Sequence, residues 1–248
     1  MSAPMTDRTL AEVTPALIED LVDANRILYH LGVVDCFGHV SARHPGDPSR
    51  FIISRSMAPA LVTPANLMAI HLDGRPVSDD APTPYLERFI HGEIYAARPD
   101  VIAIVHSHSA AVIPFGVVPG ATLKPISHMG GFIGEGAPVF EIRNTAGNSS
   151  DMLVRNAELG QALAKVLGPH NIVLMRGHGS TVVGFNLRQA VYRAVYAEVN
   201  ARQQSEALRI GSPIFLTPGE AVESAKANDG QQDRAWNLWK RSVQSRQL

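Results

Sequence analysis

The chain has 248 residues, of which 22 are basic and 23 acidic, so its formal net charge is −1. Hydrophobic residues make up 45% and charged residues 18%, a balance that excludes an intrinsically disordered chain. A net charge near zero also excludes the broad basic surface of a general nucleic-acid binder. The length suits one large domain or two small ones, and we expect no nucleic-acid partner.

The single cysteine and the amino terminus bear on the cellular compartment. Cys36 alone excludes an internal disulfide framework, which fits a reducing compartment, and its apolar surroundings predict a small buried side chain. Residues 1–14 contain charged side chains and no apolar run of signal-peptide length. Apolar runs such as residues 101–105 are far short of the ~20 residues that span a bilayer. We therefore expect a cytoplasmic protein with no membrane partner.

The amino-terminal third begins with a predicted helix over residues 16–31. Its apolar residues recur every three or four positions, and Thr14-Pro15 supplies an N-cap followed by proline. A β-type run follows at residues 51–53. Asp73-Gly74 lies between two short apolar runs within residues 67–77, which predicts a hairpin.

The rest of the chain alternates helical and strand patterns, with an irregular glycine-rich loop at residues 121–136. Helices are predicted at residues 85–97, 110–118, 151–167, 187–208 and 233–243, and strands at 101–105, 139–142, 172–175 and 181–183. Trp236 and Trp239 are expected to pack the last helix onto the body or onto a neighbouring subunit. No linker divides the chain, so we predict a single α/β domain over residues 1–248 with a C-terminal helical extension from about residue 212.

Three histidines follow apolar strands. His106 and His108 come directly after one predicted strand, and side chains two residues apart in a strand share a face. His178 follows another predicted strand and is flanked by glycines, which allow a sharp turn and a close approach. Neutral imidazoles in this arrangement can hold one divalent metal and leave coordination positions open. The alternative is a set of histidines that are hydrogen-bonded or solvated at strand ends.

The helix before the first of these strands offers Glu87 in its first turn and Glu93 further along. Glu87 lies where a proline-rich entry meets the helix, so it can reach into a cleft as a proton acceptor or a fourth ligand. A helix-start glutamate that is stabilised by the helix dipole is the alternative. Spacing alone does not choose between these interpretations.

A set of short motifs, taken in order, resembles the class II aldolase/adducin family over about residues 17–198. The motifs are Gly-His-Val-Ser-Ala-Arg at 38–43, Pro-Tyr-Leu-Glu at 84–87, Ile-Tyr at 94–95, Arg-Pro-Asp-Val at 98–101, Val-His-Ser-His at 105–108 and Gly-His-Gly at 177–179.

The resemblance implies a three-layer α/β/α fold around a mixed, mainly antiparallel sheet, and homotetramers with sites at subunit interfaces. It implies one divalent metal ion per subunit (Mn, Zn, Co or Fe) on His106, His108 and His178, with Glu87 as the adjacent acid/base. Members of this family cleave or rearrange carbon–carbon bonds next to a metal-chelated oxygen, and the metal stabilises the enolate as a Lewis acid.

The sequence departs from the family's sugar-phosphate aldolases where those enzymes hold a phosphate. They typically have Gly-Asn in the first motif and small hydroxyl residues before the catalytic glutamate, whereas this chain has Gly38-His39 and Tyr85-Leu86. Leu86 would desolvate a phosphate without offering it a hydrogen bond. We therefore expect that the phosphate site is lost.

Residues 54–59 and 85–93 resemble instead a decarboxylase branch that acts on vicinal dicarboxylates of hydroxylated rings, including 3-hydroxy-2-methylpyridine-4,5-dicarboxylate and dihydroxyphthalates. The expected reaction is decarboxylation of a small aromatic or pyridine dicarboxylate. Arg55 would anchor the second carboxylate, and His39 and Tyr85 would line the site. Glu87 or His128 would deliver the proton, His128 from the loop where aldolases of this family place a tyrosine of a neighbouring subunit.

Alternatives stay open for residues and for the chain. Arg55 could be a solvated loop arginine, and His91, one helical turn after Glu87, is expected on the helix surface. The chain could be a class II aldolase that cleaves an unphosphorylated hydroxy-carbonyl substrate, or a non-catalytic adducin-like interaction module. The intact histidine trio argues against the module, which has no use for three convergent imidazoles.

Overall fold

A seven-stranded sheet forms the centre of the protein, whose computed structural model describes residues 10 and 12–245. Most of residues 1–14, where we expected no targeting signal, lie outside the described residues. The strands lie in the order β3-β2-β1-β4-β7-β6-β5, and every neighbouring pair is antiparallel except β5 and β6. They are β1 (His39–Arg43), β2 (Arg50–Ser54), β3 (Leu67–His71), β4 (Ala103–Ser107), β5 (Val139–Phe140), β6 (Ile172–Met175) and β7 (Gly179–Gly184). The predicted α/β class with a mixed, mainly antiparallel sheet is confirmed.

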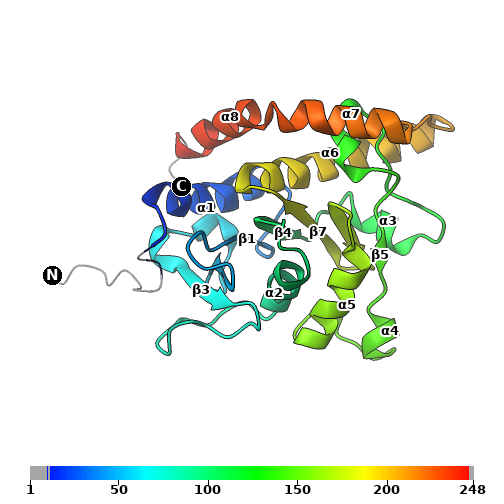
Figure 1. Cartoon of the computed structure of the whole chain (residues 1–248). Coiled ribbons are helices and arrows are strands. Elements are labelled where there is room, and N and C mark those ends of the chain that lie inside the picture. Colours follow the sequence, from blue (N-terminus) through cyan, green and yellow to red (C-terminus); the bar gives the residue numbers. More distant parts are fainter. Residues whose placement is uncertain (1–9, 11, 246–248) are drawn as a thin grey trace.

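Helices cover both faces of this sheet (Figure 1). On one face α1, α6 and α8 pack over an apolar core, and on the other face α2 and α5 do so. The helices are α1 (Pro15–His30), α2 (Arg88–Ala97), α3 (Ile113–Val117), α4 (Arg143–Ala146), α5 (Ala157–Leu167), α6 (Leu187–Ile210), α7 (Pro218–Asp229) and α8 (Gln232–Gln244). Short 3-10 turns are η2 (Pro59–Leu61), η3 (Pro64–Asn66) and η4 (His128–Ile133). The three-layer arrangement places the strand ends between two layers of helices.

Alternation along the central strands separates two kinds of environment. Val40 of β1 and Val105 of β4 are paired and pack into the core beneath α1 and α6. His39 and His106 are also paired, and they project to the other face, toward α2. Because successive side chains in a strand point to opposite faces, the same two strands build a core on one side and a polar cluster on the other.

Three predicted helices begin later than expected, among them α3, which begins at Ile113 rather than residue 110. The second helix begins at Arg88 rather than residue 85. Its N-cap residue Glu87 makes no side-chain capping bond, because its carboxylate accepts a hydrogen bond from Val154 N instead. The helix expected from residue 151 begins at Ala157, because the Asn156 side chain caps it by accepting a hydrogen bond from Leu159 N.

Three elements were not predicted: β1, α7 and the single-turn helix α4. Strand β1 alternates polar and apolar residues but is buried along its whole length. Its polar residues are untypical of a buried strand, so the sequence did not indicate one there. Helix α7 begins with a capping box between Thr217 and Glu220, a signal that the sequence contains. Strand β1 was therefore hidden by its buried polar residues, and α7 by its weak apolar periodicity.

The turn predicted at Asp73-Gly74 is confirmed, with Gly74 at φ +86°. Its second strand reduces to one bridge, between Ile70 and Pro76, since proline cannot donate to the ladder. The prediction that Cys36 is buried is wrong, because it is exposed. Asp35 accepts a hydrogen bond from Phe37 N, and this tight turn directs the segment outward.

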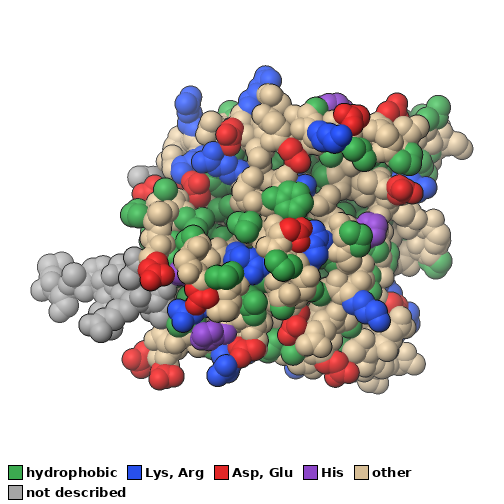
Figure 2. Space-filling model, viewed as in Figure 1, with side chains coloured by type: hydrophobic (Ala, Val, Ile, Leu, Met, Phe, Trp, Pro, Cys, Tyr) green, Lys and Arg blue, Asp and Glu red, His purple; other side chains and the backbone are tan. Residues whose placement is uncertain are grey.

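The carboxy-terminal helix packs as predicted through its tryptophans. Trp236 is fully buried in the core beneath α1 and α6, and Trp239 lies against Tyr196 with 6.2 Å between the ring centroids. Figure 2 shows positive and negative side chains interspersed over one face of the molecule. Within the described part of the chain, no helix has the length and apolar character needed to cross a bilayer.

Candidate active site

Four side chains converge at the end of β4. They are Glu87, His106, His108 and His178, and one donor atom from each lies within 4.8 Å of all the others. The Nε2 atom of His108 is 3.3 Å from Nε2 of His106 and 3.0 Å from Nε2 of His178. Oε2 of Glu87 is 3.3 Å from Nε2 of His178 and 3.8 Å from Nε2 of His106.

Hydrogen bonds fix the orientation of two of the imidazoles. Thr181 Oγ1 donates to the sulfur of Met175, so it accepts from Nδ1 of His106 at 3.3 Å. Nδ1 of His178 donates to the carbonyl of Met152 at 2.9 Å. In neutral rings both Nε2 atoms therefore carry lone pairs that point into the cluster, which is the tautomer that a metal ligand needs.

The glycines beside His178 have the local roles expected of them. Gly177 adopts φ +66°, a left-handed conformation that forms the turn after β6. A Cβ atom added at Gly179 would lie 2.0 Å from the Ser107 carbonyl oxygen. The absence of a side chain at Gly179 therefore lets the start of β7 lie directly against the end of β4. This close approach brings His178 to the end of β4, where His106 and His108 lie.

Glu87 reaches the cluster from the N-cap position of α2. Its second carboxylate oxygen, Oε1, accepts a hydrogen bond from Val154 N at 2.9 Å, and the residue is buried. Burial alone would raise its pKa, but the hydrogen bond with His178 and the nearby charges of His106 and His178 lower that pKa to about 2. Glu87 is therefore a carboxylate at neutral pH, an acceptor of protons or cations rather than a donor.

The electrostatics of the imidazoles favour a bound cation. Burial lowers the pKa of His106 well below its ordinary value, and burial together with the charge of His178 lowers the pKa of His108. For His178, burial is outweighed by the hydrogen bond and charge of Glu87, so its pKa is raised. Three lone pairs and a carboxylate that face one another repel unless a proton or a metal cation lies among them.

The donor set fits a divalent transition metal. Three imidazole nitrogens and one carboxylate match the ligand types of zinc and its neighbours in the first transition row. Ligand atoms bonded to a tetrahedral ion at about 2.0–2.1 Å lie roughly 3.4 Å apart, close to the spacing of the described nitrogens. The cluster is thus able to bind one metal ion.

Comparison with known proteins agrees with this geometry. Residues 19–205 match the family described as Class II Aldolase and Adducin N-terminal domain. The chain belongs to the class II aldolase and adducin family.

Two similar relatives within this family are decarboxylases. "Decarboxylase tropJ" of Talaromyces stipitatus is 33% identical over 92% of this chain and 94% of that protein. "3,4-dihydroxyphthalate decarboxylase" of Arthrobacter keyseri is 29% identical over 81% of this chain and 82% of that protein. The crystal structure of an aldolase II superfamily protein from Pseudomonas syringae superposes with a TM-score of 0.78 at 22% identity, covering 95% of this chain and 96% of that one. The resemblance to the family and to its decarboxylase branch is confirmed.

Two of the other predicted site residues lie beside the cluster of this class II aldolase-family protein. The His39 ring centroid lies 5.0 Å from that of His106 and 4.6 Å from that of Tyr85. The Tyr85 hydroxyl donates to the Met57 carbonyl at 2.6 Å and lies 3.1 Å from Ser54 Oγ. Tyr85 therefore packs its ring against His39, while its hydroxyl tethers the segment after β2.

Arg55 and His128 have different positions. Arg55 is exposed and directly follows Ser54, so it belongs to the segment that Tyr85 tethers. His128 is exposed at the start of η4, where its carbonyl accepts a hydrogen bond from Asn228 of α7. No contact between His128 and the four-residue cluster occurs among the described residues of one chain.

The prediction that His91 lies on the helix surface is wrong. It is fully buried, with Nε2 2.6 Å from His39 Nδ1 and Nδ1 2.6 Å from Ser41 Oγ. The helix α2 turns the stripe Glu87, His91 and Tyr95 toward the sheet, since residues four apart share a helix face. That spacing was the signal in the sequence, and it would also have found Tyr95.

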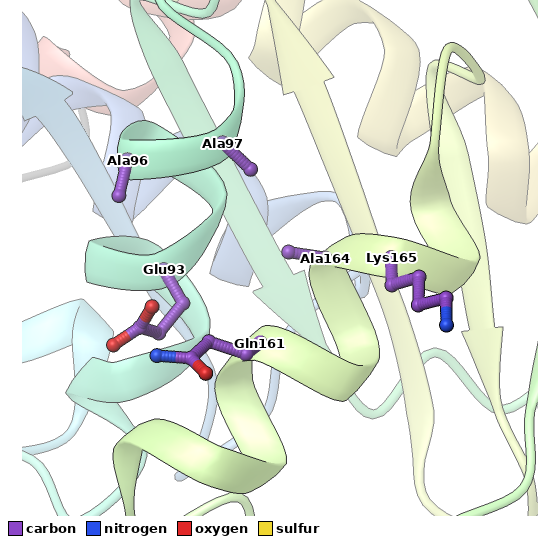
Figure 3. Close-up of a pocket in the computed structure, with 6 residues that line it drawn as sticks. All are labelled: Glu93, Ala96, Ala97, Gln161, Ala164 and Lys165. Carbon is purple, nitrogen blue, oxygen red and sulfur yellow. The ribbon is translucent and has the colours of Figure 1, made fainter.

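Glu93, the other carboxylate considered from the sequence, lies away from the cluster. It lines a groove between α2 and α5 together with Gln161 and Lys165 (Figure 3). The remaining lining residues are alanines, and none of the four cluster residues takes part. Burial raises the pKa of Glu93. This groove holds no convergent set of catalytic groups.

Proposed function

We propose that this protein is a divalent-metal-dependent carbon–carbon lyase that decarboxylates a hydroxylated aromatic or pyridine dicarboxylate. The observation that carries the proposal is the convergence of His106, His108, His178 and Glu87 in a chain whose relatives include decarboxylases. His106, His108 and His178 would hold one Mn, Zn, Co or Fe ion. When bound, such an ion acts as a Lewis acid toward substrate oxygens.

The surroundings of the cluster suit a flat ring rather than a sugar phosphate. The Phe37 ring lies 6.2 Å from that of His108 and is 65% exposed, and Leu86, next to Glu87, is 60% exposed. With His39 and Tyr85 they supply aromatic and apolar surface around the ligands. Tyr85 and Leu86 stand where a phosphate-binding relative needs small hydroxyl groups, which supports the choice of an unphosphorylated substrate.

We assign the following roles in the reaction to residues of this chain. Glu87, ionised in the free protein, accepts the proton of the substrate's ring hydroxyl. The ring carbon that carries the carboxylate gains a proton, the carbon–carboxylate bond breaks, and CO2 leaves while the electron pair restores the ring. Arg55 anchors the second carboxylate by a bidentate ion pair, which orients the ring. The proton for the ring carbon comes from Glu87 or from His128.

A role for His128 requires a second copy of the chain, since its own cluster is not in contact with it. We therefore propose a homotetramer in which His128 reaches a neighbour's site. Mixing His106→Ala subunits with His128→Ala subunits tests this arrangement. Random reassembly would pair an intact cluster with an intact His128 in about a quarter of the sites and so restore part of the activity. Mixtures as inactive as the two parents would contradict it.

We also propose that the protein is cytoplasmic, as the single cysteine leads us to expect. Fractionation of cells that express the protein tests this location.

The reaction is tested by supplying the metal-loaded protein with a panel of hydroxyphthalates and hydroxypyridine dicarboxylates, and with unphosphorylated hydroxy-ketones. We expect CO2 from the dicarboxylates and no aldehyde from the ketones. Aldehyde release without CO2 would identify an aldolase. A folded protein that retains no metal and turns over neither class would be an interaction module.

A further inference from the structure

Beside the cluster, four side chains form a buried hydrogen-bonded chain that the proposed reaction leaves unexplained. Nδ1 of His39 lies 2.6 Å from Nε2 of His91, and Nδ1 of His91 lies 2.6 Å from Ser41 Oγ. Ser41 Oγ lies 2.8 Å from the Tyr95 hydroxyl, which donates to the Ile102 carbonyl at 3.4 Å. The four side-chain residues are each at most 4% exposed.

Only one direction of donation uses all four hydrogen bonds. The carbonyl oxygen of Ile102 can only accept, so Tyr95 must donate to it, and Ser41 then donates to Tyr95. His91 in turn donates from Nδ1 to Ser41, and His39 donates from Nδ1 to His91. In the reverse direction Tyr95 would donate to Ser41, and the bond to Ile102 would be lost.

Both imidazoles in the chain are neutral, so each has one N–H and a definite tautomer. Burial lowers the pKa of His91 to about 3, against a weaker opposing effect of Glu87. His39 is 4% exposed, and its ring neighbours are Tyr85, His91 and His106, none of which offers a negative charge to an imidazolium. The direction of donation thus decides which nitrogen of His39 keeps its lone pair, and that nitrogen is Nε2.

The free nitrogen belongs to a ring in the wall of the site. His39 lies between Tyr85, at 4.6 Å between centroids, and the metal-ligand candidate His106, at 5.0 Å. Within the described part of the chain, Nε2 of His39 has no hydrogen-bond partner. A donor group that enters the site, such as a ligand hydroxyl, can therefore use it.

We propose that Tyr95, Ser41 and His91 are positioning residues that hold His39 as its Nδ1–H tautomer, so that Nε2 accepts a hydrogen bond from a substrate hydroxyl group other than the one whose proton Glu87 takes. The identity of that substrate rests on the proposed function, whereas the tautomer is a property of the free protein. A ring hydroxyl can donate to Nε2. A carboxylate or phosphate cannot, because its acceptor oxygens would face another lone pair. The hydrogen-bonded side chains therefore favour a substrate with a ring hydroxyl at this position over one with a carboxylate or phosphate there.

The tautomer is measured directly by NMR of protein labelled with 15N-histidine, as purified and after addition of Zn²⁺, with the His39 signal assigned from a His39→Asn variant. We expect a protonated Nδ1 and an unprotonated Nε2. Tyr95→Phe removes the donor to Ile102 and frees Ser41 to donate to His91, so a population with protonated Nε2 should appear. Tyr192→Phe is the matched control, because the hydroxyl of this buried tyrosine has one hydrogen-bond partner within the described part of the chain, the Met129 sulfur.

The role in selection is measured with 2,3-dihydroxybenzoate and salicylate as probe ligands, which differ by a second ring hydroxyl. The ratio of their affinities should fall about tenfold from wild type to Tyr95→Phe, the effect of one lost hydrogen bond, with unchanged metal content. Ser41→Ala breaks the chain one link closer to His39 and gives the same comparison if Tyr95→Phe does not fold.

A wild-type His39 with protonated Nε2, or a tautomer unmoved by Tyr95→Phe and Ser41→Ala, would overturn the positioning role. An unchanged affinity ratio would overturn the hydroxyl contact. Failure to release CO2 from any dicarboxylate would contradict the proposed function and leave both of these results intact.

Discussion

The two faces of the central sheet are built by the same strands but differ in the side chains that these strands contribute. Beneath α1, α6 and α8 the strands contribute side chains such as Val40 and Val105 to a continuous apolar core. Beneath α2 the alternate positions hold His39, Ser41 and His106, all buried. The first face is stabilised by apolar packing, and the second combines an apolar core beneath α2 and α5 with these polar side chains, each of which needs a partner.

The difference explains why the imidazoles at the end of β4 and β1 have fixed orientations. Each is oriented by another residue: His106 by Thr181, His178 by the Met152 carbonyl, and His39 by His91. The apolar face holds the strands in register, so the polar face can keep its donors aligned. We expect substitutions on the two faces to separate stability from metal binding.

The largest effect is expected from His106→Ala on the polar face. It removes a buried ligand candidate, so metal content should fall from one ion per subunit toward zero and activity by at least about a thousandfold. Metal analysis and turnover of a hydroxylated dicarboxylate check both. His170→Ala, an exposed histidine near the end of α5, should change neither.

On the apolar face, Trp236→Ala should lower the free energy of unfolding by about 3–5 kcal/mol, because it leaves a large cavity in the core. Denaturant titration measures the loss, and metal stoichiometry of the folded protein should stay unchanged. Leu238→Ala on the same helix, 64% exposed, serves as the control with little effect. Loss of metal from folded Trp236→Ala protein would show that the two faces are not separable.

The buried His91 should make stability depend on pH. Its pKa is about 3 in the folded protein and near 6.5 when unfolded, so the unfolded state binds more protons between these values. This contribution is complete above pH 6.5 and is lost as the pH falls toward 3, with a slope of at most about 1.4 kcal/mol per pH unit. Denaturant titrations at several pH values should show a shallower slope for His91→Asn, and His170→Ala should keep the wild-type slope.

The smallest effect is expected at the exposed rim. Arg55→Ala should raise the KM for dicarboxylates by about ten- to a hundredfold, because it removes a charge-assisted pair to the substrate. Steady-state kinetics measure this, with Arg234→Ala on the exposed side of α8 as control. An unchanged KM would make Arg55 a solvated loop residue.

Much of the fold followed from local patterns. The N-cap Thr14 with Pro15 marked α1, and the apolar run before His106 marked β4. Strand β1 escaped because its polar residues are buried by α2, which lies about fifty residues further along the chain. Cys36 was misjudged because a hydrogen bond from Phe37 N to Asp35, rather than the apolar neighbourhood, sets the local course of the chain.

The amino-acid sequence by itself determined the three histidines, the glycines that let His178 approach, and the family to which they belong. These features depend on spacing within a few residues, where strand alternation and glycine's backbone freedom act directly. Only the tertiary structure decided that Glu87 is ionised among the histidines and that His91 and Tyr95 lie behind His39. The spacing of Glu87, His91 and Tyr95 puts them on one face of a helix, but only the packing of α2 on the sheet decides that this face is buried against His39 and the cluster.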